Sequence, residues 1–188
     1  MRNVLSGVLV FVALGALASR QLDGPRPAAL GAGRPEASRP EAGAPLIPVE
    51  GIQALQLKDS FNEGRAGHFH HAIDILAPRG TPVLAAVDGT VRKLFLSRDG
   101  GITLYEFDNT GERSYYYAHL DSYADGIREG LAVHRGDVLG YVGTTGNAPP
   151  QTPHLHFAIS VLPPTKEWWK GEAIDPYPIL TRPASALQ

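Results

Sequence analysis

Two short stretches of the chain hold side chains that could bind a metal ion. One is His70-His71-Ala72-Ile73-Asp74, and the other, far downstream, is His154-Leu155-His156-Phe157. A catalytic zinc ion usually takes three protein ligands from His, Asp or Glu and leaves a fourth position for water. The two stretches supply enough ligands for such a site, so together they indicate a hydrolase.

The downstream stretch has the alternation of a β-strand. Because successive side chains of a strand point to opposite faces, His154 and His156 share one face. Leu155 and Phe157 share the other face. Such a strand can bury its apolar side in a core and direct both imidazoles into a groove. The alternative is a pair of surface histidines on an edge strand.

The upstream stretch must bend if two of its residues are to bind one ion. His70 and Asp74 are four residues apart, which in a straight strand separates their backbones by about 13 Å. We therefore expect a bend near His70, before a short strand over residues 74–77. His71 is a rival ligand, ranked second, whose alternative is a solvated histidine or one that supports a ligand. For Asp74 the alternative is a buried salt bridge or a turn cap.

A fifth candidate is His119, which follows a run of three tyrosines. Strand alternation places Tyr115, Tyr117 and His119 on a common face, and so predicts a polar, aromatic wall. A histidine beside an activated water can take up a proton. It can also stabilise the oxyanion that develops when water attacks a carbonyl. Taken alone, however, a histidine in a strand is more often structural.

The pattern as a whole resembles the lysostaphin-type zinc metallopeptidases, also called LytM-like endopeptidases, which cleave peptide bonds in bacterial peptidoglycan. The resemblance begins near Asp59-Ser60-Phe61, ends at Asp175-Pro176 and so extends through most of the chain. One departure is Ala72, where the family commonly has glycine. Besides the two histidine stretches, the matching segments are Gly80-Thr81-Pro82-Val83, Asp88-Gly89-Thr90-Val91, Tyr117-Ala118-His119-Leu120, Gly136-Asp137-Val138-Leu139-Gly140 and Gly143-Thr144-Thr145-Gly146-Asn147-Ala148.

The resemblance implies that one zinc ion is bound by His70, Asp74 and His156. It also implies that His119 and His154 are the catalytic histidines. One of these two helps to deprotonate the water, with His154 favoured. The other stabilises the tetrahedral intermediate or protonates the leaving amine. The chain has no His-Glu-x-x-His motif, so histidines must replace the glutamate base of that protease class.

Two readings other than a zinc endopeptidase remain. Some relatives are non-catalytic modules that bind the wall or activate a partner hydrolase, but those lack ligands that this chain retains. A structural zinc site is disfavoured because such sites are closed by four ligands, usually with cysteine among them. The chain contains no cysteine, which also excludes disulfides, thiol catalysis and a lipid-modified cysteine.

The predicted fold class is mainly β: a small antiparallel β-sheet domain whose loops form a narrow, zinc-containing groove. Turns at Asp88-Gly89, Asp99-Gly100-Gly101 and Asn109-Thr110-Gly111 separate several of the strands. Residues 121–130 hint at an irregular or weakly helical excursion. Trp168 and Trp169 could line the groove, bind a glycan or simply pack, and packing is favoured. The predicted strands are 83–87, 90–95, 102–107, 113–119, 138–142 and 154–161.

The N-terminal part of the chain predicts export. Residues 1–18 contain a basic Arg2, an apolar run and the small-x-small site Ala16-Leu17-Ala18, which is typical of a signal peptide. Because a membrane span needs about 20 residues, a cleaved signal peptide is favoured over a retained N-terminal membrane anchor. Residues 19–48 predict a disordered Pro/Ala/Gly-rich linker. The metallopeptidase domain then covers residues 49–183, and residues 184–188 form a tail.

These features predict where the protein acts and on what. We expect an exported protein of the periplasm or cell envelope, which a retained N-terminal segment would attach to the membrane. The net charge of −2 provides no basic patch for nucleic acid. The expected partners are peptidoglycan stem peptides, with a D-Ala to diaminopimelate cross-link favoured over a glycine bridge. The sequence identifies no regulatory protein partner.

Overall fold

The computed structural model describes residues 44–65 and 67–182, and the fold of these residues is mainly β, as predicted. Residues 1–18, most of the predicted linker and the tail lie outside the described residues. The helical segments are η2 (Ala54–Gln56) and α1 (Pro176–Thr181). The strands are β1 (Gly64–Arg65), β2 (His68–Phe69), β3 (Ile73–Leu76), β4 (Pro82–Leu84), β5 (Gly89–Ser97), β6 (Gly101–Asp108), β7 (Arg113–Tyr123), β8 (Ala132–Val133), β9 (Val138–Val142), β10 (His154–Val161) and β11 (Glu172–Ile174).

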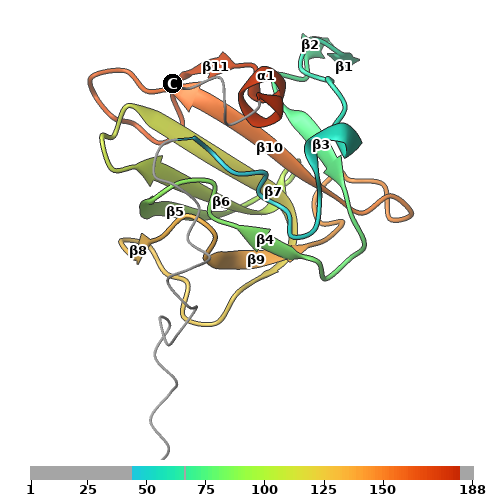
Figure 1. Cartoon of the computed structure of the whole chain (residues 1–188), viewed down its shortest axis with the longest axis horizontal. Helices are drawn as coiled ribbons and strands as arrows, with labels where there is room; N and C mark the ends of the chain where they lie inside the picture. The colour runs from blue at the N-terminus through green and yellow to red at the C-terminus, as the bar shows by residue number, and fades with distance from the viewer. Residues whose placement is uncertain (1–43, 66, 183–188) are drawn as a thin grey trace, which may run out of the picture. The chain divides into compact units, whose positions relative to one another are not determined.

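One antiparallel sheet organises the domain. Its strand order is β11-β10-β7-β6-β5-β8, with β3 added beside β10 and the β4–β9 pair joined through β7. In Figure 1 the long strands cross the centre of the domain, and β4 and β9 lie below them. A separate hairpin, β1–β2, precedes β3 in the chain. Antiparallel strands can be joined by short turns, which is why the predicted turns coincide with strand ends.

The two faces of this sheet differ in chemistry. Leu155, Phe157 and Ile159 of β10 are completely buried on one face, together with Tyr117 of β7 and Leu104 of β6. Burying a side chain of this size is worth about 1.5–3 kcal/mol, so this face must point into the core. His154 and His156 occupy the other face of β10, so the predicted alternation is confirmed.

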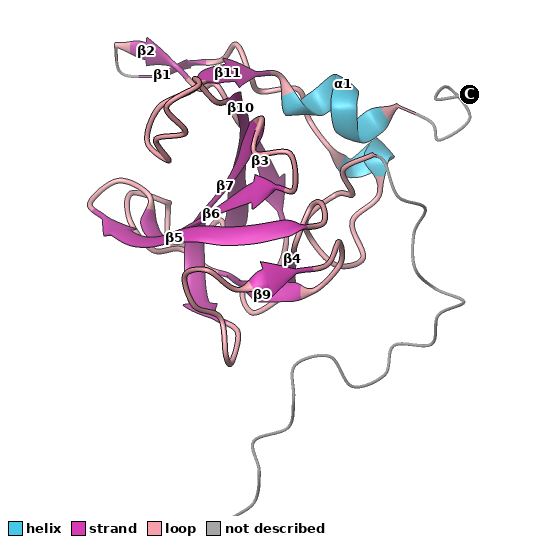
Figure 2. Cartoon of the chain, turned by 90° about the vertical axis from the view of Figure 1, so that its left-hand side faces the viewer, coloured by secondary structure: helices cyan, strands magenta, loops and turns pink. Residues whose placement is uncertain are grey.

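Helix α1 closes one edge of the core. Asp175 caps it by accepting a hydrogen bond from the Tyr177 backbone N–H at 2.9 Å. Pro176 begins the helix, a position where its missing N–H is not needed. Leu180 then packs into the core, and α1 contacts η2, as Figure 2 shows at the edge of the magenta strands.

Most of the expected strands are present, although β4 ends at Leu84 rather than at residue 87. Two other expectations also differ from the structure. Residues 121–123 extend β7, and irregular turns follow them up to residue 130, so of the two expected alternatives the irregular excursion is present and the weakly helical one is wrong. Residues 44–48, predicted as linker, lie against the sheet: the Leu84 N–H donates to the Pro48 carbonyl at 3.0 Å and the Leu46 N–H to the Ala86 carbonyl at 2.9 Å. Among the described residues, no helix is long and apolar enough to cross a membrane.

Candidate metal centre

Three predicted ligands converge at one point. His70 Nε2 lies 3.1 Å from Asp74 Oδ1 and 3.0 Å from His156 Nδ1. His156 Nδ1 and Asp74 Oδ1 are 3.2 Å apart. Ligand atoms about 2.0–2.1 Å from a tetrahedral zinc ion stand about 3.3 Å from one another. The spacing of these three atoms therefore fits a zinc ion that contacts all of them.

Local backbone geometry brings the ligands together. Asp74 of β3 is the register partner of His156 of β10, so adjacent strands present both side chains on the same face. His70 reaches them because the chain turns at His71, whose φ of 53° lies in the left-handed region. The bend expected near His70 is thus present. A non-glycine residue with positive φ is strained, so the surrounding contacts must hold it.

Hydrogen bonds set which nitrogen of each ligand histidine faces the centre. His70 Nδ1 donates to the Ser60 carbonyl oxygen at 3.1 Å, because a carbonyl can only accept. Its Nε2 is then the free ligand atom. Burial lowers the pKa of His156, so this ring is neutral at neutral pH and presents a lone pair. Neutral imidazole is the form that binds metal ions.

The two oxygens of the Asp74 carboxylate have different partners. Burial by itself raises its pKa, but hydrogen bonds with His156 and His70 and their charge hold the pKa well below its usual range. Asp74 is therefore ionised. Its Oδ1 faces the two histidines, whereas its Oδ2 accepts a hydrogen bond from Arg65 Nη2 at 2.8 Å. Arg65 was missed in the sequence, since the two-residue strand β1 is too short to show a pattern.

The remaining two candidate histidines lie beside the three ligands. The His119 and His154 rings are 4.9 Å apart, and the His119 ring is 5.6 Å from that of His156. Nδ1 of His119 donates to the Thr145 carbonyl at 2.8 Å, and Nδ1 of His154 donates to the Thr152 carbonyl at 2.8 Å. Each ring in its neutral form therefore has an unprotonated Nε2 that can accept a proton. Burial lowers the pKa of His119 to about 4, which favours that neutral form.

A β-bulge directs His119 toward the centre. Between Leu104 and Ile102 of β6, strand β7 advances from Tyr117 to Leu120, which is one residue more. His119 has a φ of 60° at this point, and its N–H donates to the Gly100 carbonyl at 2.8 Å. Such a bulge changes the face on which the next side chain lies.

The bulge overturns the expected aromatic wall. Tyr115 and Tyr117 do not share the face of His119; both are buried in the core, at 1% and 0% exposure. Tyr116 instead packs edge-on against His156, with ring centres 5.9 Å apart. The extra residue of the bulge shifts His119 onto the face of Tyr116. Strict alternation along this strand therefore failed to predict Tyr116 at the groove.

The rival ligand His71 lies apart from the three ligands. Its side chain is exposed and lies beside Phe61 and Phe69 in a tilted arrangement, with ring centres 5.4 and 6.0 Å away. Among the described residues, the group of side chains whose atoms could hold a metal ion consists of His70, Asp74 and His156. The sequence left His70 and His71 as alternative ligands. The structure places His70 at the metal position and His71 away from it.

An open groove of about 680 Å³ leads to the centre. All five candidate residues line it, so a peptide chain could reach the metal position and both further histidines at once. Its wall also carries one acidic and one basic residue, Asp99 and Arg65. The other lining residues are Leu76, Gly100, Tyr116, Ala118, Asn147, Ala148, Pro149 and Thr152.

Residues 68–176 match the model of peptidase family M23. The chain belongs to this family. A search of solved structures found the catalytic domain of the antimicrobial peptidase lysostaphin from Staphylococcus simulans, with a TM-score of 0.53 and 31% identity over 63% of this chain and 84% of that one. The mainly β fold and the lysostaphin-type resemblance are therefore confirmed.

Relatives of known activity are longer proteins. The chain is 37% identical to the L-Ala–D-Glu endopeptidase of Bacillus subtilis over 59% of its own length and 34% of the relative's. It is 38% identical to the DD-carboxypeptidase/endopeptidase Mpg of Neisseria meningitidis over 49% of its own length and 20% of the relative's. The M23 chain thus spans about a third or less of these two relatives.

Proposed function

We propose that this M23 protein is a zinc-dependent endopeptidase that hydrolyses peptide cross-links of bacterial peptidoglycan in cell-wall remodelling. The observation that carries the proposal is the convergence of His70 Nε2, Asp74 Oδ1 and His156 Nδ1 within 3.0–3.2 Å of one another. These atoms would bind one zinc ion. The names of the three relatives described above, each a peptidase or endopeptidase, support the reaction class.

The side chains around the metal position suit hydrolysis of an amide. A zinc ion held by these three residues would supply a Lewis acid for activating water and polarising the scissile carbonyl. His154 Nε2 lies 3.8 Å from Asp74 Oδ1, so it can receive a proton from a water bound beside Asp74. His119 then hydrogen-bonds the developing oxyanion or passes a proton to the leaving amine. His154 thus acts as the base.

For the bond cleaved, we propose the D-Ala to diaminopimelate cross-link. The name of the Neisseria relative, a DD-carboxypeptidase/endopeptidase, supports this choice. The name of the Bacillus relative specifies a different bond, between L-Ala and D-Glu. The residues that line the groove must therefore select which bond is cleaved. The substrate is exported material, and we accordingly propose that the protein acts in the periplasm or cell envelope. Fractionation of cells that express the full chain tests this location.

Mass spectrometry of released muropeptides tests the reaction and the bond together. The protein is incubated with purified sacculi and zinc, beside the variants His156→Ala and His134→Ala. His134 is a matched control, because its side chain is 74% exposed and lies outside the groove. We expect new uncross-linked stem peptides with the wild type and with His134→Ala, and none with His156→Ala.

Two results would contradict the proposal. Cleavage that persists in His156→Ala would remove the metal centre from the reaction. Zinc-loaded, folded protein that cuts neither the D-Ala cross-link, nor the L-Ala–D-Glu bond, nor a glycine bridge would favour the module that binds the wall or activates another hydrolase. Cleavage of one of the latter two bonds would retain the endopeptidase and correct its substrate.

A further inference from the structure

Five aromatic side chains form a continuous strip that starts at the metal centre. The strip consists of Tyr116, Tyr105, Trp168, Trp169 and Phe95. Its ring centres are 4.6 Å apart from Tyr116 to Tyr105 and 4.9 Å apart from Tyr105 to Trp168. Trp168 also lies 5.3 Å from Trp169 and 5.4 Å from Phe95. The inner end meets the groove, where Tyr116 contacts His156.

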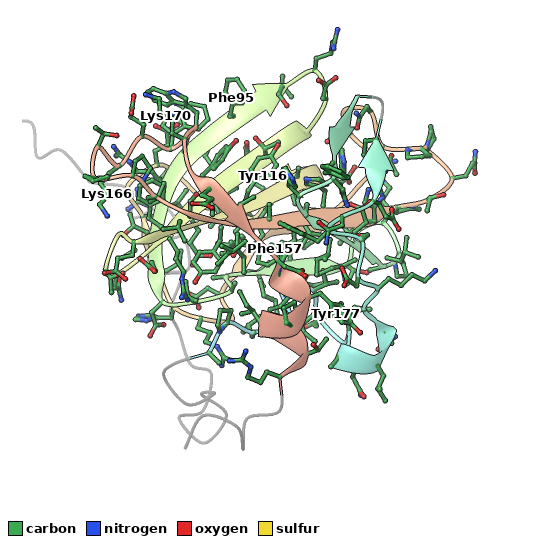
Figure 3. The ribbon with its side chains drawn as sticks, turned by 90° about the horizontal axis from the view of Figure 1, so that it is seen from above. Phe95, Tyr116, Phe157, Lys166, Lys170 and Tyr177 are labelled. Carbon is green, nitrogen blue, oxygen red and sulfur yellow. The ribbon has the colours of Figure 1, made fainter. Side chains whose placement is uncertain are left out.

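Sheet register places this strip on the same face as the metal ligands. Tyr116 of β7 pairs with Tyr105 of β6, so the two rings lie side by side. Phe95 of β5 pairs with Thr103, which is two residues from Tyr105 and therefore on its face. Trp168 and Trp169 come from the segment between β10 and β11. In Figure 3 Phe95 and Lys170 lie at the same edge of the molecule, with Tyr116 closer to its centre.

Packing explains the inner rings but not the outer ones. Tyr105, Tyr116 and Trp168 are half-buried. Trp169, in contrast, is 60% exposed and Phe95 is 42% exposed. Large apolar groups that remain exposed side by side often mark a binding surface. The outer end of the strip has this character and is continuous with the groove.

We propose that the outer end of the aromatic strip, formed by Trp168, Trp169 and Phe95, binds the glycan strand that carries the stem peptide. This inference rests on the proposed function, because it assigns the sugar part of the same substrate. A pyranose ring presents a face of C–H groups that can stack on the electron-rich face of an aromatic ring. The hydroxyl and N-acetyl groups at its rim need donors and acceptors, and Glu167 and Lys170 lie beside the two tryptophans.

The charges around the strip match a neutral ligand. Lys170 Nζ lies 2.8 Å from Glu167 Oε2, and Lys93 Nζ lies 2.7 Å from Glu129 Oε1. Lys166 donates to the Gly111 carbonyl. These lysines are therefore already partnered, and the strip offers stacking surface rather than net charge. The sugar backbone of peptidoglycan is uncharged where stem peptides are attached, so stacking is the interaction it can make.

The length of the strip also fits the substrate. From His156 the path runs through ring-centre steps of 5.9, 4.6 and 4.9 Å to Trp168. An extended peptide advances about 3.3 Å per residue, so four or five residues cover this path. A stem peptide is of this length. A glycan strand on the tryptophans therefore leaves the distal end of its stem peptide at the metal centre.

Tryptophan fluorescence tests the strip independently of catalysis. The chain has two tryptophans, and both belong to the strip. The full chain is titrated with glycan strands from which the stem peptides have been removed. We expect a saturable change in emission, and Trp169→Ala to weaken the binding about tenfold, as read from Trp168. Leu96→Ala is the matched control, since Leu96 is 74% exposed on the opposite face of β5 from Phe95.

An emission spectrum that does not respond to the glycan strands would overturn the inference and leave the strip to a protein partner. Equal weakening by Leu96→Ala and Trp169→Ala would overturn it as well. Neither result depends on whether the protein cuts peptide bonds.

Kinetics separate this inference from the proposed function. Cross-linked muropeptides that retain their disaccharide are compared with the same peptides after removal of the sugar. We expect kcat/KM to be about tenfold higher for the sugar-bearing substrate, and Phe95→Ala to reduce that ratio. Equal values of kcat/KM would refute glycan binding while the endopeptidase stands. Failure to cut either substrate would refute the endopeptidase and leave the fluorescence titration to decide on the strip.

Discussion

Tyr116 and Tyr117 are neighbours in the chain, yet they belong to different regions of the molecule. Tyr117 is completely buried on the core face of the sheet, 5.3 Å from the ring of Phe157, and donates a hydrogen bond to Glu106. Tyr116 lies on the groove face beside His156. One face of the sheet therefore holds the fold together, and the other presents the candidate metal ligands and the two further histidines to the groove.

In this domain, different faces of the sheet therefore determine folding stability and metal-centre chemistry. Substitutions on the groove face should change metal binding or rate with little effect on folding. Substitutions on the core face should do the reverse. Variants on each face can test whether stability and activity change independently.

The largest effect is expected at the two further histidines of the groove. We expect His154→Asn and His119→Asn each to lower kcat by about 10²–10⁴-fold, because each removes a proton-transfer or oxyanion partner. Zinc content, measured on the purified protein, should stay at one ion per chain. The unfolding midpoint should also remain unchanged. Loss of zinc together with activity would show that these side chains hold the centre rather than act beside it.

On the opposite face, Phe157→Ala should destabilise the domain by about 3–5 kcal/mol, since it leaves a cavity under the sheet. Denaturant unfolding, with Leu96→Ala as an exposed control, measures the effect. The control should stay within about 0.5 kcal/mol of the wild type. A variant that loses zinc affinity at temperatures where it is still folded would argue against independent faces.

A smaller effect is expected at Arg65, which contacts the metal centre through Asp74. Arg65→Gln frees Asp74 Oδ2 from its hydrogen bond, and we expect zinc affinity to fall about 10–100-fold. Competition with a chromophoric chelator measures this affinity without reference to activity. Arg79→Gln provides the control, because Arg79 pairs with Asp121 outside the metal centre. Equal affinities in both variants would mean that Asp74 needs no such support.

A pH-dependent effect is expected at Glu106, on the core face. Burial raises the pKa of Glu106 to about 8, from 4.5. Between these two pH values the folded state keeps a proton that the unfolded state releases, so stability falls as pH rises. The slope is at most about 1.4 kcal/mol per pH unit. Glu106→Gln cannot ionise and should flatten the profile from pH 5 to 8; an unchanged slope would refute the assignment.

Much of this arrangement could be predicted because local patterns determine it. The alternation of apolar residues in 154–161 is enough to place both histidines of β10 on one face. The four-residue spacing of His70 and Asp74 required a bend, and His71 supplies it. The start of α1 also had a local signal that went unused, since Asp175 followed by Pro176 is typical of a helix N-terminus.

What could not be predicted depends on contacts between distant segments. The bulge at His119 is held by the Gly100 carbonyl and the Thr145 carbonyl, and nothing in the run of tyrosines marks it. Its consequence is that Tyr116, rather than its two neighbours, faces the groove. The contact of Arg65 with Asp74 likewise depends on how the β1–β2 hairpin folds over β3.

Two glycines join the loops that hold His119. A side chain at Gly146 (φ 74°) would place its first carbon 2.2 Å from the Asp99 carbonyl oxygen, and one at Gly101 (φ 67°) would place it 2.2 Å from Thr145 Oγ1. Neither position accepts another residue unless both loops move and the imidazole moves with them. This wall therefore tolerates few substitutions. New substrate preferences would arise across the groove, in the β1–β2 hairpin, where a side chain at Gly64 would meet open space.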